Sequence, residues 1–117
     1  MKGFFKFGCP ALKINIENKE IETILDTGFN GYIMLPQSII SNLGLEQIGT
    51  SDYSTASGEE KITYVYKGKI RFLDEIIEVP ILSTDSDISL AGMELFFNCK
   101  IIIEKSKNII EIIKEKT

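Results

Sequence analysis

Apolar and polar residues alternate along the first part of the chain. In ALKINI, the side chains of Leu12, Ile14 and Ile16 would share one face of a strand, with polar residues between them. The polar letters ENKE, residues 17–20, predict a hairpin turn. The apolar run IETIL, residues 21–25, then predicts the returning strand. This pattern predicts a β-hairpin with one buried face.

The next two segments have different patterns. GYIML, residues 31–35, lacks alternation, which predicts a strand buried on both faces. PQSIISNLGL, residues 36–45, predicts a short helix with one apolar face. Pro36 is suited to the first turn of this helix, and Gly44 is suited to a left-handed stop.

A long hairpin is predicted over residues 50–73, with its tip at ASGEE. Gly58 would supply the unusual dihedral angle that this tip needs. Gly68 interrupts the return strand, which predicts a bend or a bulge there. A turn at residues 74–75 then leads into the apolar strand IIEVPIL.

The last third of the chain contains two more apolar segments. LAGMELFF, residues 90–97, predicts an apolar stretch that passes through Gly92 into a short helix. KIIIEKSKNIIEII, residues 100–113, predicts a closing hairpin with its turn at KSKN. Together the elements predict an all-β class, mainly β with two short helices, in a single domain over residues 1–117.

Composition supports a globular β protein and excludes several functions. Among 117 residues, 44% are hydrophobic and 21 are isoleucine, a β-branched residue that favours strands. The net charge is −4 and basic residues form no patch, so we expect no nucleic-acid partner. The apolar runs are too short to span a membrane, and the start is too short and polar for a signal peptide. We therefore expect a cytoplasmic protein without a membrane partner.

The titratable residues narrow the possible chemistry. The absence of histidine removes Ser-His and Cys-His nucleophilic sites and the usual zinc sites. Cys9 and Cys99 lack metal-type spacing; buried free thiols are favoured, with a disulfide left open. Asp85 and Asp87 lack the other ligands of a calcium loop. We expect no metal and no cofactor, and hydrolysis would depend on carboxylates, lysine, tyrosine or hydroxyls.

Asp26 is the most informative carboxylate. As a lone tripeptide, Asp-Thr-Gly is explained by a turn, because aspartate caps its own backbone and glycine accepts positive φ. Here apolar residues precede and follow the tripeptide, which predicts a buried loop. A lone buried carboxylate costs several kcal/mol unless it is paired or protonated. A second carboxylate would share its proton and supply a general acid and a general base together. The simplest source is Asp26 of a second copy.

These residues resemble a known family. ILDTGFNGYIMLP, residues 24–36, resembles the active-site segment of the retropepsin-like (clan AA) aspartic proteases, above all their small single-domain prokaryotic members. LAGMELF is similar to the family's apolar-apolar-glycine segment and its short helix. The hairpin STASGEEKITY lies between them, where the family has its flap. The resemblance spans about residues 10–113 and implies a homodimeric acid-protease barrel.

The resemblance also implies roles for individual residues. Asp26 would be the catalytic carboxyl, one from each subunit. The active-site loop would be supported by Thr27, which would hydrogen-bond across the two-fold axis, and by Gly28. Gly92 would pack closely beneath this loop. Substrate would be bound by the cleft and the flap tip, through Asn30, Gly31, Ala56, Ser57 and Gly58.

Three functions follow from these expectations. The first is a homodimeric aspartic endopeptidase that hydrolyses peptide bonds with a water activated by an Asp dyad. The alternative is a proteolytically silent binding or dimerisation module of the same fold. The third is a processing domain that acts on one dedicated site of a partner. Because the closing hairpin is longer than in retroviral enzymes, the terminal sheet of a dimer is expected to be built differently.

Overall fold

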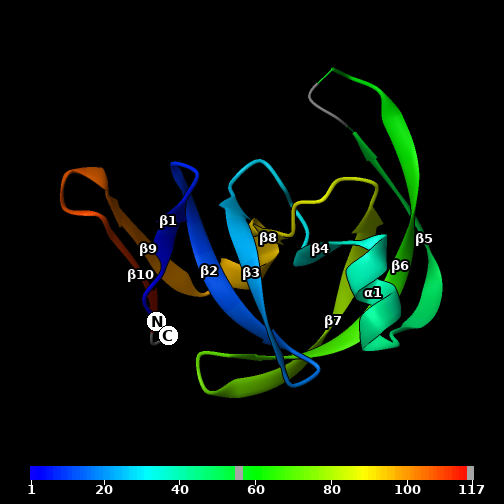
Figure 1. The fold of residues 1–117 in the computed structure, drawn as a ribbon, viewed down its shortest axis with the longest axis horizontal. Helices are drawn as coiled ribbons and strands as arrows, with labels where there is room; N and C mark the ends of the chain where they lie inside the picture. Colours follow the sequence, from blue (N-terminus) through cyan, green and yellow to red (C-terminus); the bar gives the residue numbers. More distant parts are fainter. Residues whose placement is uncertain (55–56, 116–117) are drawn as a thin grey trace.

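The computed structural model describes residues 1–54 and 57–115 (Figure 1). The elements fold into an eight-stranded sheet and a separate two-stranded sheet. In chain order, the elements are β1 (Phe4–Lys6), β2 (Cys9–Ile16), β3 (Lys19–Asp26), β4 (Ile33–Pro36), α1 (Gln37–Leu43), β5 (Glu46–Ser54), β6 (Glu60–Phe72), β7 (Glu75–Thr84), β8 (Leu90–Gly92), the 3₁₀ turn η1 (Met93–Phe96), β9 (Cys99–Glu104), the 3₁₀ turn η2 (Lys105–Lys107) and β10 (Ile109–Lys114).

Tight turns make the predicted hairpins. Glu17 and Asn18 both have positive φ, 49° and 66°, between β2 and β3. Leu73 and Asp74 repeat this pattern between β6 and β7, with φ of 51° and 65°. Two successive left-handed residues match the right-handed twist of the flanking strands. The predicted hairpins over β2–β3, β6–β7 and β9–β10 are therefore confirmed.

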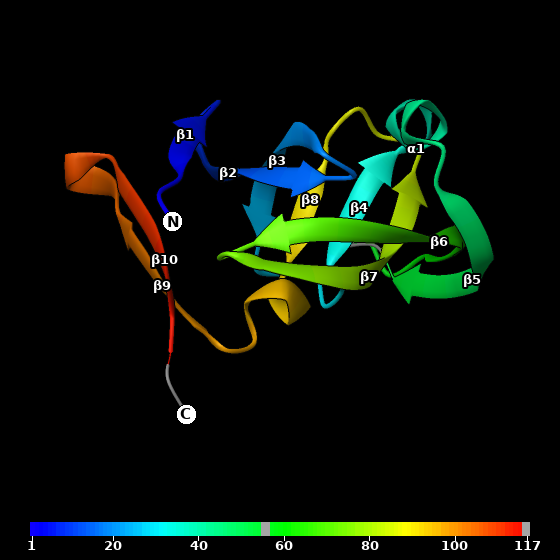
Figure 2. The ribbon, with the colours of Figure 1, turned by 90° about the horizontal axis from the view of Figure 1, so that it is seen from below.

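The strand order is not the chain order. The large sheet runs β1-β2-β3-β8-β4-β7-β6-β5. β8 lies between β3 and β4, parallel to β3 and antiparallel to β4 (Figure 2). β4 also pairs in parallel with β7, so it has strand neighbours on both edges. This central position buries every residue of β4, as its lack of alternation predicted.

One hydrophobic core joins the strands and the helix. It contains buried side chains from β2, β4, β6 and β7, together with Ile40 of α1 and Leu95 and Phe96 of η1. The rings of Phe72 and Phe96 meet edge to face, 5.7 Å apart. The closing hairpin joins the same core through Ile110 and Ile112. The core therefore fixes η1 and the closing hairpin relative to the large sheet.

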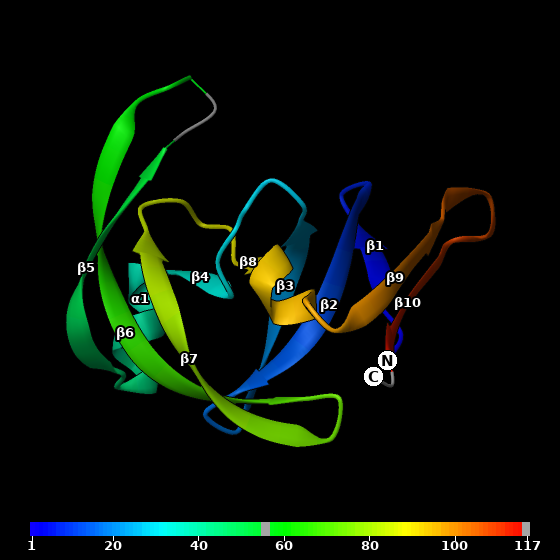
Figure 3. The same cartoon turned by 180° about the vertical axis from the view of Figure 1, so that it is seen from behind.

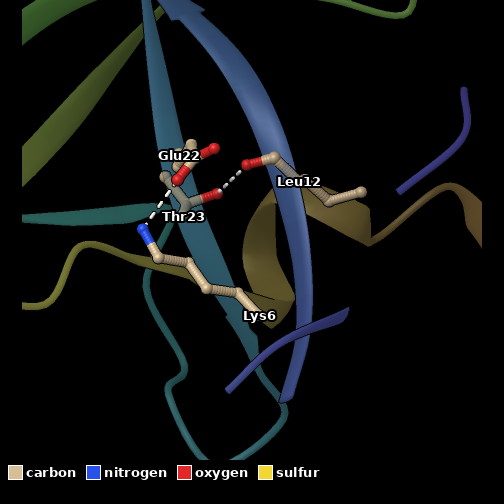
Figure 4. A network of polar contacts seen from close by, with 4 residues as sticks. All are labelled: Lys6, Leu12, Glu22 and Thr23. Carbon is tan, nitrogen blue, oxygen red and sulfur yellow. Dashed lines mark hydrogen bonds and ion pairs between the residues drawn. The ribbon is translucent and has the colours of Figure 1, made fainter. Parts of the chain in front are cut away.

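The first strand, β1, lies on β2 and was not among the predicted elements. Lys6 Nζ on β1 is 2.6 Å from Glu22 Oε1 on β3 (Figure 4). The hydrogen bond from Lys6 holds the pKa of Glu22 below its ordinary value. Thr23, also on β3, is buried, and its hydroxyl donates to the carbonyl oxygen of Leu12 on β2, 3.2 Å away. Polar contacts thus tie β1, β2 and β3 together beside the end of β3.

The helices depart from the prediction in two ways. The helix after β4 is confirmed, but Pro36 is its N-cap rather than a residue of its first turn. Gly44 ends α1 in the left-handed conformation with φ of 66°, as predicted. The second predicted helix is a single 3₁₀ turn, η1, because Phe97 and Asn98 turn the chain into β9. The described residues contain no helix of the length and apolar character needed to cross a membrane.

Two further predictions are wrong. The predicted bulge at Gly68 is absent, because the β6–β7 ladder pairs Gly68 with Val79 without a register shift. The irregular step lies instead in the β5–β6 ladder, between Gln47 and Gly49. Gly68 instead makes room for Ile81, since an added Cβ would lie 2.5 Å from Ile81 Cδ1. The cysteines are free, but neither is buried: Cys9 is exposed and Cys99 is partly exposed. β2 begins at Cys9 beside an open turn, which leaves that side chain in solvent.

Candidate active site

Asp26 is the last residue of β3 and begins a loop that runs to β4. Its Oδ1 accepts a hydrogen bond from Gly28 N at 2.9 Å. The Asp26 carbonyl accepts a second one from Phe29 N at 3.2 Å. These contacts are the aspartate turn expected of a lone Asp-Thr-Gly. They leave Oδ2 without a hydrogen bond to any of the described residues.

The loop is attached to β8 and η1 from one side. Gly92 N donates to Tyr32 O at 2.8 Å, and Met93 N donates to Phe29 O at 2.8 Å. Three hydrogen-bonded elements thus meet at one point: the end of β3, the loop and the β8–η1 junction (Figure 3). A loop held at several backbone positions can present its carboxylate in one geometry.

At Gly92, the backbone of β8 packs directly against the backbone of the loop that follows Asp26. In the β3–β8 ladder it lies opposite Asp26. A Cβ built on Gly92 would be 2.2 Å from the Gly31 carbonyl oxygen and 2.8 Å from that of Phe29. Both neighbours are backbone atoms, so no side chain can move aside. Close packing of Gly92 under the Asp26 loop, which the resemblance implied, is what the structure contains.

The loop is more exposed than the sequence predicted. Asp26 is partly exposed, and Thr27, Gly28 and Asn30 are exposed. The expectation of a buried loop is therefore wrong for a single chain. The reason is that the apolar residues flanking the tripeptide belong to the strands, with Leu25 of β3 and all of β4 buried, whereas the loop itself extends past the end of β3. No ion pair involves Asp26 anywhere in residues 1–54 and 57–115.

The predicted flap corresponds to the β5–β6 hairpin. The outer end of this hairpin extends past the other strands of the sheet, on the side toward which the loop after β3 also points (Figures 1 and 3). Ser57 and Gly58 are exposed at this tip, and Gly58 has the predicted positive φ, 86°. Ala56 lies outside the described residues. A Cβ added to Gly58 would meet no atom within 4 Å, so this point of the tip is open.

Buried hydroxyl groups attach the returning strand of this hairpin to β7. Thr63 Oγ1 donates to the Ser83 carbonyl oxygen at 2.5 Å and lies 2.9 Å from Ser83 Oγ. Ser83 belongs to β7, where it pairs with Leu35 of β4. The tip therefore extends from a part of β6 that is anchored to β7 in the sheet.

One positioning residue escaped the sequence prediction. The carbonyl oxygen of Phe29 accepts a hydrogen bond from Met93 N, and its backbone N–H donates to the Asp26 carbonyl oxygen. The ring of Phe29 lies against both Gly31 and Gly92. An added Cβ on Gly31 would be 2.6 Å from Phe29 Cζ. The available signal was an aromatic residue among small and polar loop residues, which indicates an inward-facing side chain.

A cavity of about 450 Å³ lies between η1, the β6–β7 turn and the start of β9, and Tyr32, which precedes β4, is part of its lining. Its lining includes Phe72, Ile77, Leu95 and Cys99, but not Asp26. The described residues contain no cluster of three metal-ligating side chains. Neither feature provides chemistry at Asp26.

The fold matches that of retropepsin-like aspartic proteases of known structure. Among solved structures, the chain is similar to a retropepsin-like aspartic protease from Rickettsia conorii, with 25% identity, a TM-score of 0.70 and coverage of 97% of this chain and 88% of that one. It is also similar in fold to the EIAV protease in complex with the inhibitor HBY-793, with 16% identity, a TM-score of 0.69 and coverage of 81% and 93%.

A third neighbour is the retroviral protease-like domain of Ddi1 from Leishmania major, with 9% identity, a TM-score of 0.55 and coverage of 94% and 98%. No family model matches the chain, and no curated protein matches it. The structural neighbours confirm the resemblance to retropepsin-like aspartic proteases that the sequence predicted.

Proposed function

We propose that this chain is an aspartic endopeptidase whose active site forms between two copies, each contributing Asp26. The observation that carries the proposal is the state of Asp26 in one chain. Its carboxylate lies at the end of β3, with one oxygen hydrogen-bonded to Gly28 and no cationic partner among the described residues. A carboxylate held in this way is available to a second carboxylate brought to it by a two-fold axis.

Two such carboxylates would perform the reaction without a cofactor. Held close together, they cannot both ionise, so they titrate as a pair that shares one proton. The ionised member accepts a proton from the attacking water, and the protonated member donates to the carbonyl oxygen of the scissile peptide bond. This division of roles suits a chain that contains no histidine.

The other predicted residues have supporting roles in this proposal. Thr27 and Gly28 form the exposed turn that would meet its copy, with Thr27 hydrogen-bonding across the axis. Asn30 and Gly31 line the cleft beside the scissile bond. The flap tip, residues 56–58, closes over an extended peptide and excludes water. The similarity to proteases of known structure supports these roles. We also propose that the protein is located in the cytoplasm.

The test is replacement of the carboxyl by an amide in Asp26→Asn. Since a general acid–base group contributes on the order of 10²–10⁴ in rate, we expect cleavage of a peptide library at acidic pH to fall by about 10³-fold. Asp74→Asn is the matched control, because Asp74 lies in the exposed β6–β7 turn with positive φ that asparagine accepts. Equal cleavage by wild type and Asp26→Asn would remove the proposal. Binding of peptides by a wild type that cleaves none between pH 3 and 8 would instead support the silent module.

A further inference from the structure

The cavity of about 450 Å³ beside η1, called the η1 cavity from here on, has an apolar floor. Its boundaries are η1, the β6–β7 turn and the start of β9, which Figure 3 shows on one side of the molecule. On the floor, Phe72, Val79 and Leu95 are buried, while Ile77 and Cys99 pack against the core and stay partly exposed. Pockets of about 300–1,000 Å³ with an apolar lining accommodate small organic molecules.

The rim of the η1 cavity carries an excess of negative charge. Three exposed glutamates, Glu75, Glu78 and Glu94, line it together with one exposed lysine, Lys114. Lys114 pairs with Glu75, and Glu78 lies 4.0 Å from Lys67 Nζ. In the described part of the chain, no basic side chain pairs with Glu94. A recess with one dominant sign of charge attracts counter-ions, so this cavity favours a cation.

Two aromatic rings complete the lining. Tyr32 is partly buried against the core, whereas Phe97 is 82% exposed. A ligand that covers the ring of Phe97 removes a large apolar surface from water, which favours binding. The face of an aromatic ring also attracts a cation placed against it. The lining therefore suits a molecule with an apolar body and one positive charge.

Two residues of the lining also hold the loop that follows Asp26. The Tyr32 carbonyl oxygen accepts a hydrogen bond from Gly92 N at 2.8 Å. Glu94 N donates to the Gly31 carbonyl oxygen at 3.2 Å. A ligand in contact with the side chains of Tyr32 and Glu94 binds the arrangement in which both hydrogen bonds are formed. It therefore favours that arrangement over one in which the loop has opened.

We infer that the η1 cavity is a binding site for a small organic cation with an aromatic or aliphatic body, and that this ligand stabilises the loop after Asp26. The positive group lies beside Glu94, and the apolar body lies on the floor between Tyr32 and Phe97. Binding at this site does not depend on the proposed function, because the carboxylate of Asp26 is not part of the cavity lining.

Two probes of the same shape and opposite charge test the site. Phenylbutylamine carries a positive charge at neutral pH, and phenylbutyrate carries a negative one. In a backbone-amide NMR titration, we expect the amine to bind with a Kd on the order of 1 mM, as befits a molecule of this size. Its largest shifts should lie at Tyr32, Glu94, Phe97 and Cys99. Phenylbutyrate should bind at least about tenfold more weakly.

Two variants locate the charge and the ring. Glu94→Gln should weaken binding of the amine about fivefold, since it removes the carboxylate beside the positive group. Glu20→Gln is the matched control: it changes the net charge equally, at an exposed position of β3 outside the cavity, and should bind like wild type. Phe97→Ala should weaken binding roughly threefold.

Hydrogen exchange tests the connection to the loop. At ten times its Kd, the amine should slow exchange of the Gly92 and Glu94 amides about tenfold, because both must be released from the loop before they exchange. The Gly49 amide in β5, far from the cavity in the strand order, should exchange at an unchanged rate. Unchanged exchange at Gly92 and Glu94 would overturn the stabilisation of the loop.

Several results would overturn the binding site itself. They are equal affinity for the two probes, binding to Glu94→Gln as tight as to wild type, and largest shifts at residues 26–28 instead of the cavity lining. Shifts at the lining that follow protein concentration without any probe would identify a second copy as the occupant and would also overturn the inference.

The outcomes separate this inference from the proposed function. If the amine binds as expected but the wild type cleaves no peptide, the η1 cavity stands as a cation site and the peptidase proposal fails. If the wild type cleaves peptides and the amine does not bind, the peptidase proposal stands and the cavity inference fails.

Discussion

Gly92→Ala is predicted to damage the support of the Asp26 loop. The added methyl group would lie 2.2 Å from the Gly31 carbonyl oxygen, 2.6 Å from Phe29 Cδ2 and 2.8 Å from the Phe29 carbonyl oxygen. The aromatic ring could rotate, but the two carbonyl groups can yield only if the loop backbone moves. Such a movement would also lengthen the hydrogen bonds from Gly92 N and Met93 N to the loop.

The size of the effect follows from these contacts. Overpacking a well-packed site costs about 1–3 kcal/mol. Weakening the two backbone hydrogen bonds adds about 1 kcal/mol. We expect the free energy of unfolding to fall by about 3 kcal/mol. For a chain of this length, about 4 °C of melting temperature corresponds to each kcal/mol, so Tm should fall by about 12 °C.

The assay is urea and thermal unfolding of wild type and variant at one protein concentration, since association shifts apparent stability. Gly49→Ala is the matched control: it adds the same methyl group in β5, where a Cβ would meet nothing within 4 Å. Its free energy of unfolding should change by less than about 0.5 kcal/mol. A Gly92→Ala protein as stable as Gly49→Ala would refute the argument that backbone contact at Gly92 holds the loop.

Two other predictions concern the packing around η1. Phe96→Ala should lower the free energy of unfolding by about 3–5 kcal/mol, because Phe96 is 2% exposed and packs on Phe72. Phe97 is 82% exposed, so Phe97→Ala should change the free energy of unfolding little. Equal losses for the two variants in urea unfolding would contradict this prediction. Burial raises the pKa of the Cys99 thiol, against a lowering effect of Lys114. The unfolded chain therefore releases this thiol proton first, and the free energy of unfolding should fall as pH rises from the ordinary cysteine pKa through the raised one. Cys99→Ser should remove that fall in urea unfolding between pH 7 and 10, and an unchanged slope would contradict the assignment.

Local signals in the sequence determined most of the strands and turns. The turn at Glu17–Asn18, the left-handed ends at Gly44 and Gly58, and the unbroken apolar run of β4 depend on residues close together in the chain. Their dihedral preferences and alternation act within a few residues, so the structure agrees with the prediction there. The position of Asp26 between two apolar strands could be inferred for the same reason.

Other features depended on which distant segments became neighbours. β8 pairs in parallel with β3, with Asp26 opposite Gly92, and this pairing joins parts of the chain that no periodicity relates. The exposure of the Asp26 loop could not be predicted either. Apolar residues on both sides of a loop show that the adjoining strands are buried, but not whether the loop itself extends into solvent.

The sequence by itself therefore determined the local elements and led to the prediction that Asp26 is the catalytic residue. Only the tertiary structure decided how that carboxylate is supported, through backbone contacts with Gly92 and Phe29. It also decided that residues 1–3 pair with β10, a contact that joins segments far apart in the sequence. The physical reason is that backbone preferences are properties of a few adjacent residues, whereas strand neighbours and exposed edges are set by the packing of the whole chain around one core.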